Sequence, residues 1–297
     1  MFDIPFLERI YGKIKTKPCD TLIISRLMYP DLKDHPLGGN ALKHWGKHLG
    51  EEKIDFNNFE YFTDEMLDYC IQDVKLNMRV YLEQEKFRED FPKPIQLEHL
   101  TTKIIANQID NGYGFDLEAA EDLQMQLLAD KAAIDDSMRK IFPPIIEERW
   151  SDKTGKRLKD KVTIFNPSSR QQIADRLMKR GWEPKQFTDK ENITMNEAVL
   201  RTIKKPELQL IAKRFARYFL LQKRLAILES WLDACQEDGR VHGRVMTLRT
   251  ITGRMAHNSP NMAQVPATYS PYGKECRRLW TVSNPMTHKL VGTDASG

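Results

Sequence analysis

The sequence has few cysteines, and their spacing suits neither a zinc site nor a disulfide framework. Among 297 residues there are four, Cys19, Cys70, Cys235 and Cys276, with no C-x-x-C pair, so we expect reduced thiols in a cytosolic protein. Long apolar runs are also missing, since no stretch approaches the roughly 20 residues that span a bilayer. The N-terminus shows no basic region followed by an apolar core. We therefore expect a soluble protein with no signal peptide and no membrane partner.

Basic residues are concentrated in one stretch of the chain. The formal net charge is only +4, but residues 143–224 contain 20 Lys and Arg against 10 Asp and Glu. Residues 1–100 contain 14 Lys and Arg against 18 Asp and Glu. A concentrated basic stretch suits a phosphate backbone. The alternative is a solvated, lysine-rich surface, and composition alone does not decide between the two.

Apolar spacing and capping residues predict a mixed α/β chain. Residues 21–24 (TLII) are apolar and β-branched, as in a buried strand. Helices are predicted over residues 40–49, 63–83, 96–109, 117–141, 168–180 and 206–235. Their predicted N-caps include Thr63, Asp116 and Ser168. The apolar stripe of the third helix consists of Leu97, Leu100, Ile104 and Ile105. A hairpin turn is predicted at residues 152–155, and short strands and turns after Gly239.

Proline and glycine divide the chain into three parts. The run Phe91-Pro92-Lys93-Pro94 is the first boundary, and Asp238-Gly239 marks the second. These positions predict domains over residues 1–92, 93–238 and 239–297. We find no internal repeat and no low-complexity tract.

A series of short motifs fills residues 239–297. Thr-Gly-Arg at 252–254 is followed by Pro-Asn at 260–261, Gln-x-Pro at 264–266 and Ser-Pro-Tyr-Gly at 270–273. The sequence VGTDASG then places Asp294 at the end of an apolar run. Each motif alone is weak, but their order and spacing are specific. The series resembles the start of the palm domain of family A DNA polymerases, most closely those of the phage type.

The palm resemblance implies roles in template-directed nucleotidyl transfer. Arg254 would contact the primer end through the minor groove, where every base pair offers acceptors, and Asn261 and Gln264 would contact the nearby duplex. Asp294 would bind both Mg²⁺ ions that join the primer 3′-hydroxyl and the incoming dNTP. The family's second palm aspartate and its fingers helix would lie beyond Gly297.

Residues 164–190 and 220–231 resemble the thumb of the phage polymerases. The start of the predicted helix at Ser168 and Ser169, with Arg170, would hold a DNA phosphate through free backbone amides. Lys223 and Arg224 would hold another; for both sets the alternative is a solvated helix face. One phage enzyme recruits thioredoxin through a long insertion in this region. Because about twenty residues separate Pro144 from Phe165 here, we expect no thioredoxin partner.

The first ninety residues resemble the later part of the family's 3′–5′ exonuclease. Residues 19–35 and 40–50 match it, and Tyr69-x-x-x-Asp73 matches its last motif. Tyr69 would orient the attacking water, and Asp73 and Asp3 would bind metal. The Asp-x-Glu pair that opens the exonuclease is missing, so tight metal binding is not expected from two carboxylates.

The resemblance implies a fold with three parts. These are the C-terminal part of a ribonuclease-H-like exonuclease domain, a mainly α thumb and the first β-rich segment of a palm. The leading interpretation is a fragment of a DNA polymerase that binds primer-template DNA without catalysis, in the cytoplasm of a phage-infected bacterium. One alternative is a subunit of a split polymerase, completed by a second polypeptide carrying the fingers and the rest of the palm. Another is a non-catalytic DNA-binding protein.

Overall fold

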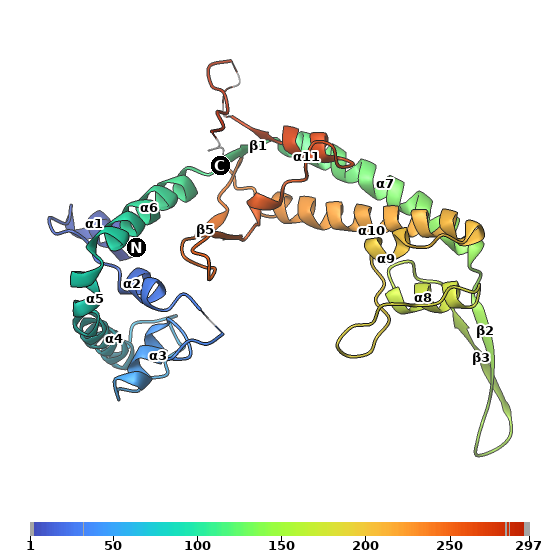
Figure 1. Ribbon diagram of the computed structural model, residues 1–297, viewed down its shortest axis with the longest axis horizontal. Helices are drawn as coiled ribbons and strands as arrows, with labels where there is room; N and C mark the ends of the chain where they lie inside the picture. The colour runs from blue at the N-terminus through green and yellow to red at the C-terminus, as the bar shows by residue number, and fades with distance from the viewer. Residues whose placement is uncertain (1–2, 32, 283, 285, 294–297) are drawn as a thin grey trace. The chain divides into compact units, whose positions relative to one another are not determined.

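The chain forms two compact units. The computed structural model describes residues 3–31, 33–282, 284 and 286–293, excluding the side chains of Asp3 and Pro5 (Figure 1). Unit 1 joins the residues up to Tyr113 with Val241–Gln264, and unit 2 joins Gly114–Arg240 with the residues from Val265 onward. The predicted mixture of helices and short strands is confirmed. The ribonuclease-H-like part and the three domain boundaries stay predictions.

Unit 1 is mainly helical, with one small pair of strands. The antiparallel strands pair Arg244 with Asn258 and Met246 with Ala256. In chain order the elements are α1 (Asp3–Tyr11), α2 (Thr21–Met28), α3 (Leu42–His48), α4 (Asp64–Glu83), α5 (Glu85–Asp90), α6 (Pro92–Asn111), β5 (Arg244–Met246), β6 (Ala256–Asn258) and the short 3-10 helix η1 (Met262–Gln264).

The prediction of a strand at residues 21–24 is wrong, because these residues begin helix α2. The side chain of Asp20 accepts hydrogen bonds from the backbone N–H groups of Leu22 and Ile23, which caps the first turn. Ile23, Ile24 and Ser25 are buried in sequence along that turn. A four-residue apolar run fits a buried helical turn as well as a strand, and the local cap decides for the helix.

Helix α4 confirms the predicted cap at Thr63, whose hydroxyl accepts from the N–H of Met66. Leu76 and Val80 form its buried face. On the same helix a second set of apolar side chains is exposed: Leu67, Ile71, Val74, Met78 and Leu82. Helix α4 therefore carries apolar residues on two faces.

Helix α6 begins at Pro92, inside the predicted boundary. Proline is favoured in a first turn because its missing N–H would have no helical partner there. Of the predicted apolar stripe only Ile105 is buried, and Leu97, Leu100 and Ile104 are exposed. The helical spacing was predicted correctly, but it did not identify which residues pack.

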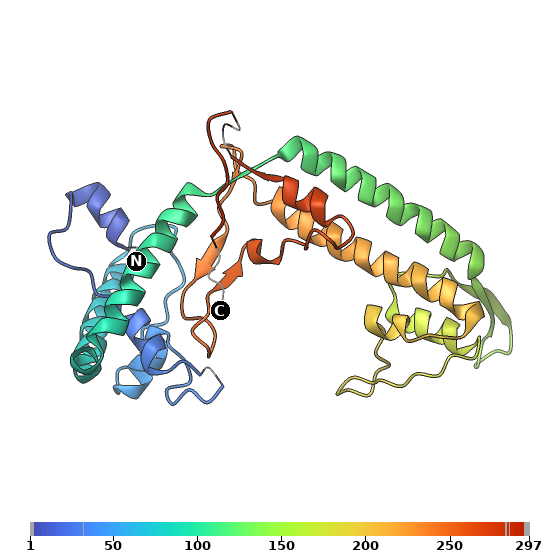
Figure 2. The ribbon, with the colours of Figure 1, turned by 45° about the horizontal axis from the view of Figure 1, so that its top comes forward.

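Unit 2 is dominated by two long helices that lie side by side, α7 (Leu117–Ile141) and α10 (Pro206–Leu232) (Figure 2). Its other elements are β2 (Ile145–Trp150), β3 (Arg157–Thr163), α8 (Arg170–Met178), α9 (Glu197–Arg201), α11 (Gly273–Arg278) and β7 (Trp280–Thr281). A three-stranded sheet has the order β4-β1-β7, where β1 is Tyr113–Phe115 and β4 is Arg240–Val241. In it Phe115 pairs with Trp280 in antiparallel register.

The main core of unit 2 lies where α7, α8 and α10 meet. Three aromatic rings pack together at its centre: Phe142 and Phe165 are tilted with centroids 4.8 Å apart, and Phe142 and Phe215 are stacked with centroids 5.9 Å apart. Ile173 and Leu177 of α8 are fully buried in the same cluster. Burial and close packing of these large apolar side chains stabilise the unit.

Two predicted local features of unit 2 are confirmed. Asp116 caps α7 by accepting from the N–H of Ala119. Strands β2 and β3 form the predicted hairpin, pairing Ile145 with Thr163 and Trp150 with Arg157. Gly155, with φ of +63°, lies in its turn, where the left-handed conformation favours glycine.

The predicted N-cap of α8 is wrong by one residue. Ser169, not Ser168, accepts from the N–H of Gln172. The hydroxyl of Ser168 is instead 2.9 Å from the hydroxyl of Tyr218 and accepts from the amide of Gln222. Two adjacent serines both satisfy the cap rule, and a contact distant in sequence selects between them.

Within the residues described, no helix is both long enough and apolar enough to cross a membrane.

Candidate functional site

The Thr-Gly-Arg motif lies in the loop that joins β5 to β6 in unit 1. Thr250 organises this loop: its hydroxyl accepts from the N–H of Arg254 at 2.9 Å, and its carbonyl accepts from the N–H of Gly253. Gly253 has φ of +74°, which a residue with a side chain adopts only with strain. The side chain of Arg254 is exposed. The loop is thus held by hydrogen bonds to the hydroxyl and the carbonyl of Thr250, and the exposed guanidinium of Arg254 can contact a ligand.

Asn261 directly precedes the short helix η1, and Gln264 is its last residue. The side chain of Asn261 accepts from the N–H of Ala263, so part of its hydrogen-bonding capacity is used within the turn. Gln264 is exposed. A β-carbon on Gly243 would lie 2.0 Å from the sulfur of Met262. Gly243 thus packs closely against the Met262 side chain of η1, which would have to move to admit a larger residue there.

The three residues predicted to bind phosphate at the start of α8, Ser168, Ser169 and Arg170, all have contacts within the chain. The hydroxyl groups of Ser168 and Ser169 are hydrogen-bonded as described above, and Arg170 lies 6.0 Å from the ring centroid of Phe219. Arg170 itself is exposed. The backbone amides of the first turn and the Arg170 guanidinium are the groups that could meet a phosphate. That contact stays a prediction.

Lys223 and Arg224 differ in what their side chains contact. Lys223 is exposed, whereas Arg224 is only 7% exposed and donates to the carbonyl of Pro271 at 3.2 Å and to the hydroxyl of Ser270 at 2.7 Å. Arg224 therefore fastens the Ser-Pro-Tyr-Gly motif to α10, and its contact with DNA stays a prediction. A cavity of about 550 Å³ beside these residues is lined by apolar side chains, by Glu197 and by five basic residues, Arg201, Lys213, Arg217, Lys223 and Arg224.

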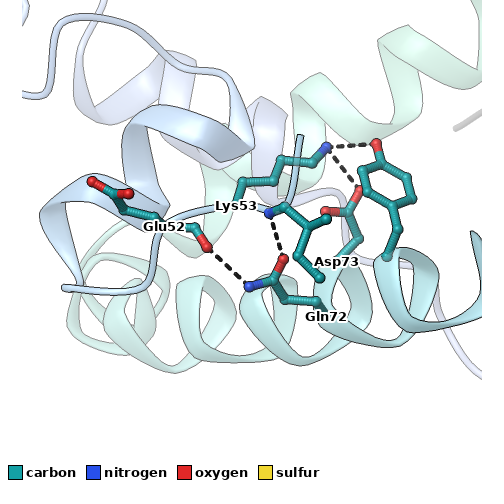
Figure 3. Close-up of polar contacts among 6 residues, drawn as sticks. Glu52, Lys53, Gln72 and Asp73 are labelled. Atoms are coloured by element: carbon teal, nitrogen blue, oxygen red, sulfur yellow. Dashed lines mark hydrogen bonds and ion pairs between the residues drawn. The ribbon is translucent and has the colours of Figure 1, made fainter. Parts of the chain in front are cut away.

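Tyr69 and Asp73, predicted from the sequence as exonuclease residues, lie on α4 and form a polar cluster with Lys53 from the preceding segment (Figure 3). The ammonium of Lys53 lies 2.8 Å from the hydroxyl of Tyr69 and 2.9 Å from a carboxylate oxygen of Asp73. Gln72 binds the backbone on either side of Lys53, accepting from the N–H of Ile54 and donating to the carbonyl of Glu52. Burial lowers the pKa of Lys53, but the hydrogen bonds to Tyr69 and Asp73 outweigh it, so the pKa is raised.

The described residues do not by themselves form a magnesium site. Among them, no group of three or more His, Cys, Asp or Glu side chains is placed to hold a metal ion. Asp73 has one buried oxygen without a hydrogen-bond partner in the described chain, but its other oxygen is paired with Lys53. The remaining predicted ligands lie elsewhere: Asp294 is outside the described residues, and so is the side chain of Asp3.

Two participants in these sites were missed from the sequence. Lys53 lies 20 residues before Asp73 in the sequence, and no motif surrounds it. Asp130, on α7, accepts a hydrogen bond from Tyr272 and forms a 3.2 Å ion pair with Arg217. Both contacts join distant parts of the chain, and neither residue type nor spacing indicated them.

The chain belongs to DNA polymerase family A, whose family model matches residues 146–297. Among curated relatives, the DNA-directed DNA polymerase of Enterobacteria phage T3 is 27% identical and that of Escherichia phage T7 is 26% identical. Both alignments cover 98% of this chain and 57% of the relative. The chain thus spans little more than half the length of these relatives.

A solved structure gives the same fold. The POL domain of Pol1 from M. smegmatis, in complex with DNA primer-template and dNTP, has a TM-score of 0.69 to this chain. The match covers 89% of this chain and 41% of that one, with 15% sequence identity. At this identity the likeness establishes the fold and does not transfer individual residue roles.

Proposed function

We propose that this chain is part of a template-directed DNA polymerase that extends primed DNA from dNTPs during replication. It would supply the later part of the exonuclease (residues 1–92), the thumb (93–238) and the start of the palm (239–297). The observation that carries the proposal is the family A match over residues 146–297. The alignment of 98% of the chain with phage polymerases supports it across the remaining residues.

Binding to primer-template DNA is the part of this function that the described residues support best. Arg254 projects from a loop fixed by Thr250 and has no side-chain partner among the described residues. A guanidinium in the minor groove donates to acceptors that every base pair presents, which checks pairing without reading sequence. Asn261 and Gln264 would extend that contact along the duplex.

Catalysis is proposed for the intact polymerase rather than for this chain alone. Its magnesium requirement, with Asp294, Asp73 and Asp3 as predicted ligands, belongs to that proposal. Tyr69 would serve the proofreading reaction next to Asp73. Two of these predicted ligands, Asp294 and the side chain of Asp3, lie outside the described residues. That the isolated chain binds DNA without extending or trimming it stays a prediction, which primer extension and 3′-end trimming assays with Mg²⁺ test.

Binding of a labelled primer-template, followed by fluorescence anisotropy, tests the proposal. Arg254→Ala should weaken binding by about fivefold or more, because a charged hydrogen bond to the duplex is lost. Arg9→Ala, an exposed arginine on α1, is the matched control and should bind like the wild type. Equal affinity for the wild type and Arg254→Ala would remove the minor-groove role.

A second candidate function is a subunit of a split polymerase. The exposed apolar stripe on α4 (Leu67, Ile71, Val74, Met78 and Leu82) favours it, because surfaces of this kind commonly contact another polypeptide. The test is primer extension with Mg²⁺ and dNTPs, using the chain alone and mixed with a polypeptide carrying the fingers and the rest of the palm. Extension only in the mixture supports the split enzyme, and extension by neither sample contradicts it.

A further inference from the structure

Three arginines of unit 1, Arg26, Arg244 and Arg249, are not among the predicted site residues. Arg26 on α2 donates from Nη1 to the carbonyl of Thr247 at 3.1 Å. Thr247 follows β5 directly and is 5% exposed, and its hydroxyl lies 3.2 Å from that of Thr102 on α6. The Arg26 guanidinium is therefore fixed against the end of β5 by a buried residue.

Two more arginines flank that anchoring point. Arg244 begins β5, three residues before Thr247, and Arg249 lies two residues after it. Both side chains are exposed. The N–H of Arg249 donates to the carbonyl of Arg254 at 3.3 Å, which places the two arginines opposite each other across the loop. Burial lowers the pKa of Arg26 most, and the charges of Arg249 and Arg244 lower it further.

The positive charges of this cluster are not balanced within the described part of the chain. No described carboxylate forms an ion pair with Arg26, Arg244 or Arg249, and Asp20 is the acidic group near enough to raise the pKa of Arg26. Like charges held together repel one another, and a bound anion relieves that repulsion. The planar guanidinium matches the oxygens of a phosphate with two parallel hydrogen bonds.

We propose that Arg26, Arg244 and Arg249 form a phosphate-binding cluster that holds the DNA backbone next to the groove contacted by Arg254. This inference rests on the proposed binding of primer-template DNA. A backbone hydrogen bond joins Arg249 to Arg254 across one loop. A duplex whose minor groove is contacted by Arg254 would therefore have its phosphate backbone close to Arg249. Phosphate contacts of this kind position the duplex and carry no sequence preference.

The experiment compares Arg26→Gln, Arg244→Gln and Arg249→Gln with the control Arg9→Gln, which removes the same charge from α1. Anisotropy with a labelled primer-template is measured at several KCl concentrations. Each cluster variant should weaken binding by about two- to fivefold, as for exposed ion pairs. Each should also reduce the slope of log affinity against log salt by about 1. Arg9→Gln should change neither quantity.

Melting temperatures identify any variant that fails to fold. If Arg26→Gln fails to fold, the variants at the exposed positions 244 and 249 still test the proposal.

The outcomes separate this inference from the proposed function. If the wild type binds and the three variants match Arg9→Gln, the cluster is wrong and the polymerase assignment stands. If the wild type shows no salt-dependent binding to primed DNA, both are wrong. Titration with inorganic tripolyphosphate distinguishes the source of the phosphate. Tripolyphosphate binding that is lost when all three arginines are replaced by Gln together, with DNA affinity unchanged, would assign the cluster to a free polyphosphate and overturn the backbone contact.

Discussion

At the residue scale, Tyr272 connects the Ser-Pro-Tyr-Gly motif to α7. Its hydroxyl donates to a carboxylate oxygen of Asp130 and accepts from Arg217 at 3.0 Å. Burial raises the pKa of Tyr272 most, and the hydrogen bond to Asp130 raises it further. The protonated hydroxyl is therefore the form that the folded protein favours.

Replacing this hydroxyl should have an effect that depends on pH. A pKa raised in the folded state gives stability that is fully present below the unfolded tyrosine pKa of about 10 and is lost as pH rises through the folded value. Tyr272→Phe should therefore lower the free energy of unfolding at pH 8, by less than about 1 kcal/mol because the group is partly exposed. The difference should shrink above pH 10. Urea unfolding from pH 8 to 11 measures it, with the exposed Tyr269→Phe as the control. A difference that stays constant with pH would show that Tyr272 contributes by packing alone.

Local residue signals were predictable from the sequence, and distant contacts were not. The caps at Thr63 and Asp116 depend on backbone groups three residues away, so the motif itself contains the contact. The cap at Ser169 was misassigned because the partner of Ser168, Tyr218, lies 50 residues away. Lys53 and Arg26 were missed for the same reason. Their partners are set by packing, which has no spacing rule.

At the scale of single elements, helix α7 depends on the cap at its first turn. Asp116 accepts from the N–H of Ala119 at 3.1 Å. Its negative charge also interacts favourably with the positive N-terminal end of the helix dipole. Asp116→Ala should lower the free energy of unfolding by about 1 kcal/mol. Asp122→Ala, on the exposed face of the same helix, removes an equal charge without removing a cap. Urea unfolding should show a loss for the first variant and little change for the second. Equal losses would mean that charge, not capping, matters.

Helix α10 should be far more sensitive on its buried face than on its exposed one. Phe215 is fully buried among Phe142 and Phe165, whereas Leu210 is 60% exposed. Phe215→Ala should cost about 3–5 kcal/mol, from lost burial and the cavity left behind. Leu210→Ala should stay within about 0.5 kcal/mol. Denaturant midpoints of the two variants measure the difference. A small loss for Phe215→Ala would mean that the three-ring core repacks or is not formed.

Element type was predictable where a pattern was long and capped. Helices α4, α7 and α10 repeat their apolar residues over many turns, and the structure has all three. The four-residue run at 21–24 carried no periodicity, so its helix was mistaken for a strand. The stripe on α6 had the correct period, yet most of it is exposed. The spacing of apolar residues identifies one face of a helix. Whether that face is buried depends on how the rest of the chain packs.

At the scale of the whole molecule, the position of positive charge matters more than its total. The formal net charge is +4, yet residues 143–224 contain twice as many basic as acidic residues. Composition left two interpretations of this stretch, a phosphate-binding surface and a solvated one. The β2–β3 hairpin lies within it and exposes Lys153, Lys156 and Lys159. The two interpretations differ in whether these lysines contact DNA.

Two triple variants with the same change in charge should separate these interpretations. Lys153, Lys156 and Lys159 are replaced by Gln in one, and the exposed Lys13, Lys15 and Lys17 of unit 1 in the other. If the basic stretch binds the backbone, the hairpin variant should lower the salt slope of primer-template affinity by up to about 3, because each lost phosphate contact releases about one counterion fewer. The other variant should keep the wild-type slope. Anisotropy titrations over a series of salt concentrations give both slopes. Equal reductions would show that total charge governs binding, and an unchanged slope in the hairpin variant would make its lysines a solvated surface.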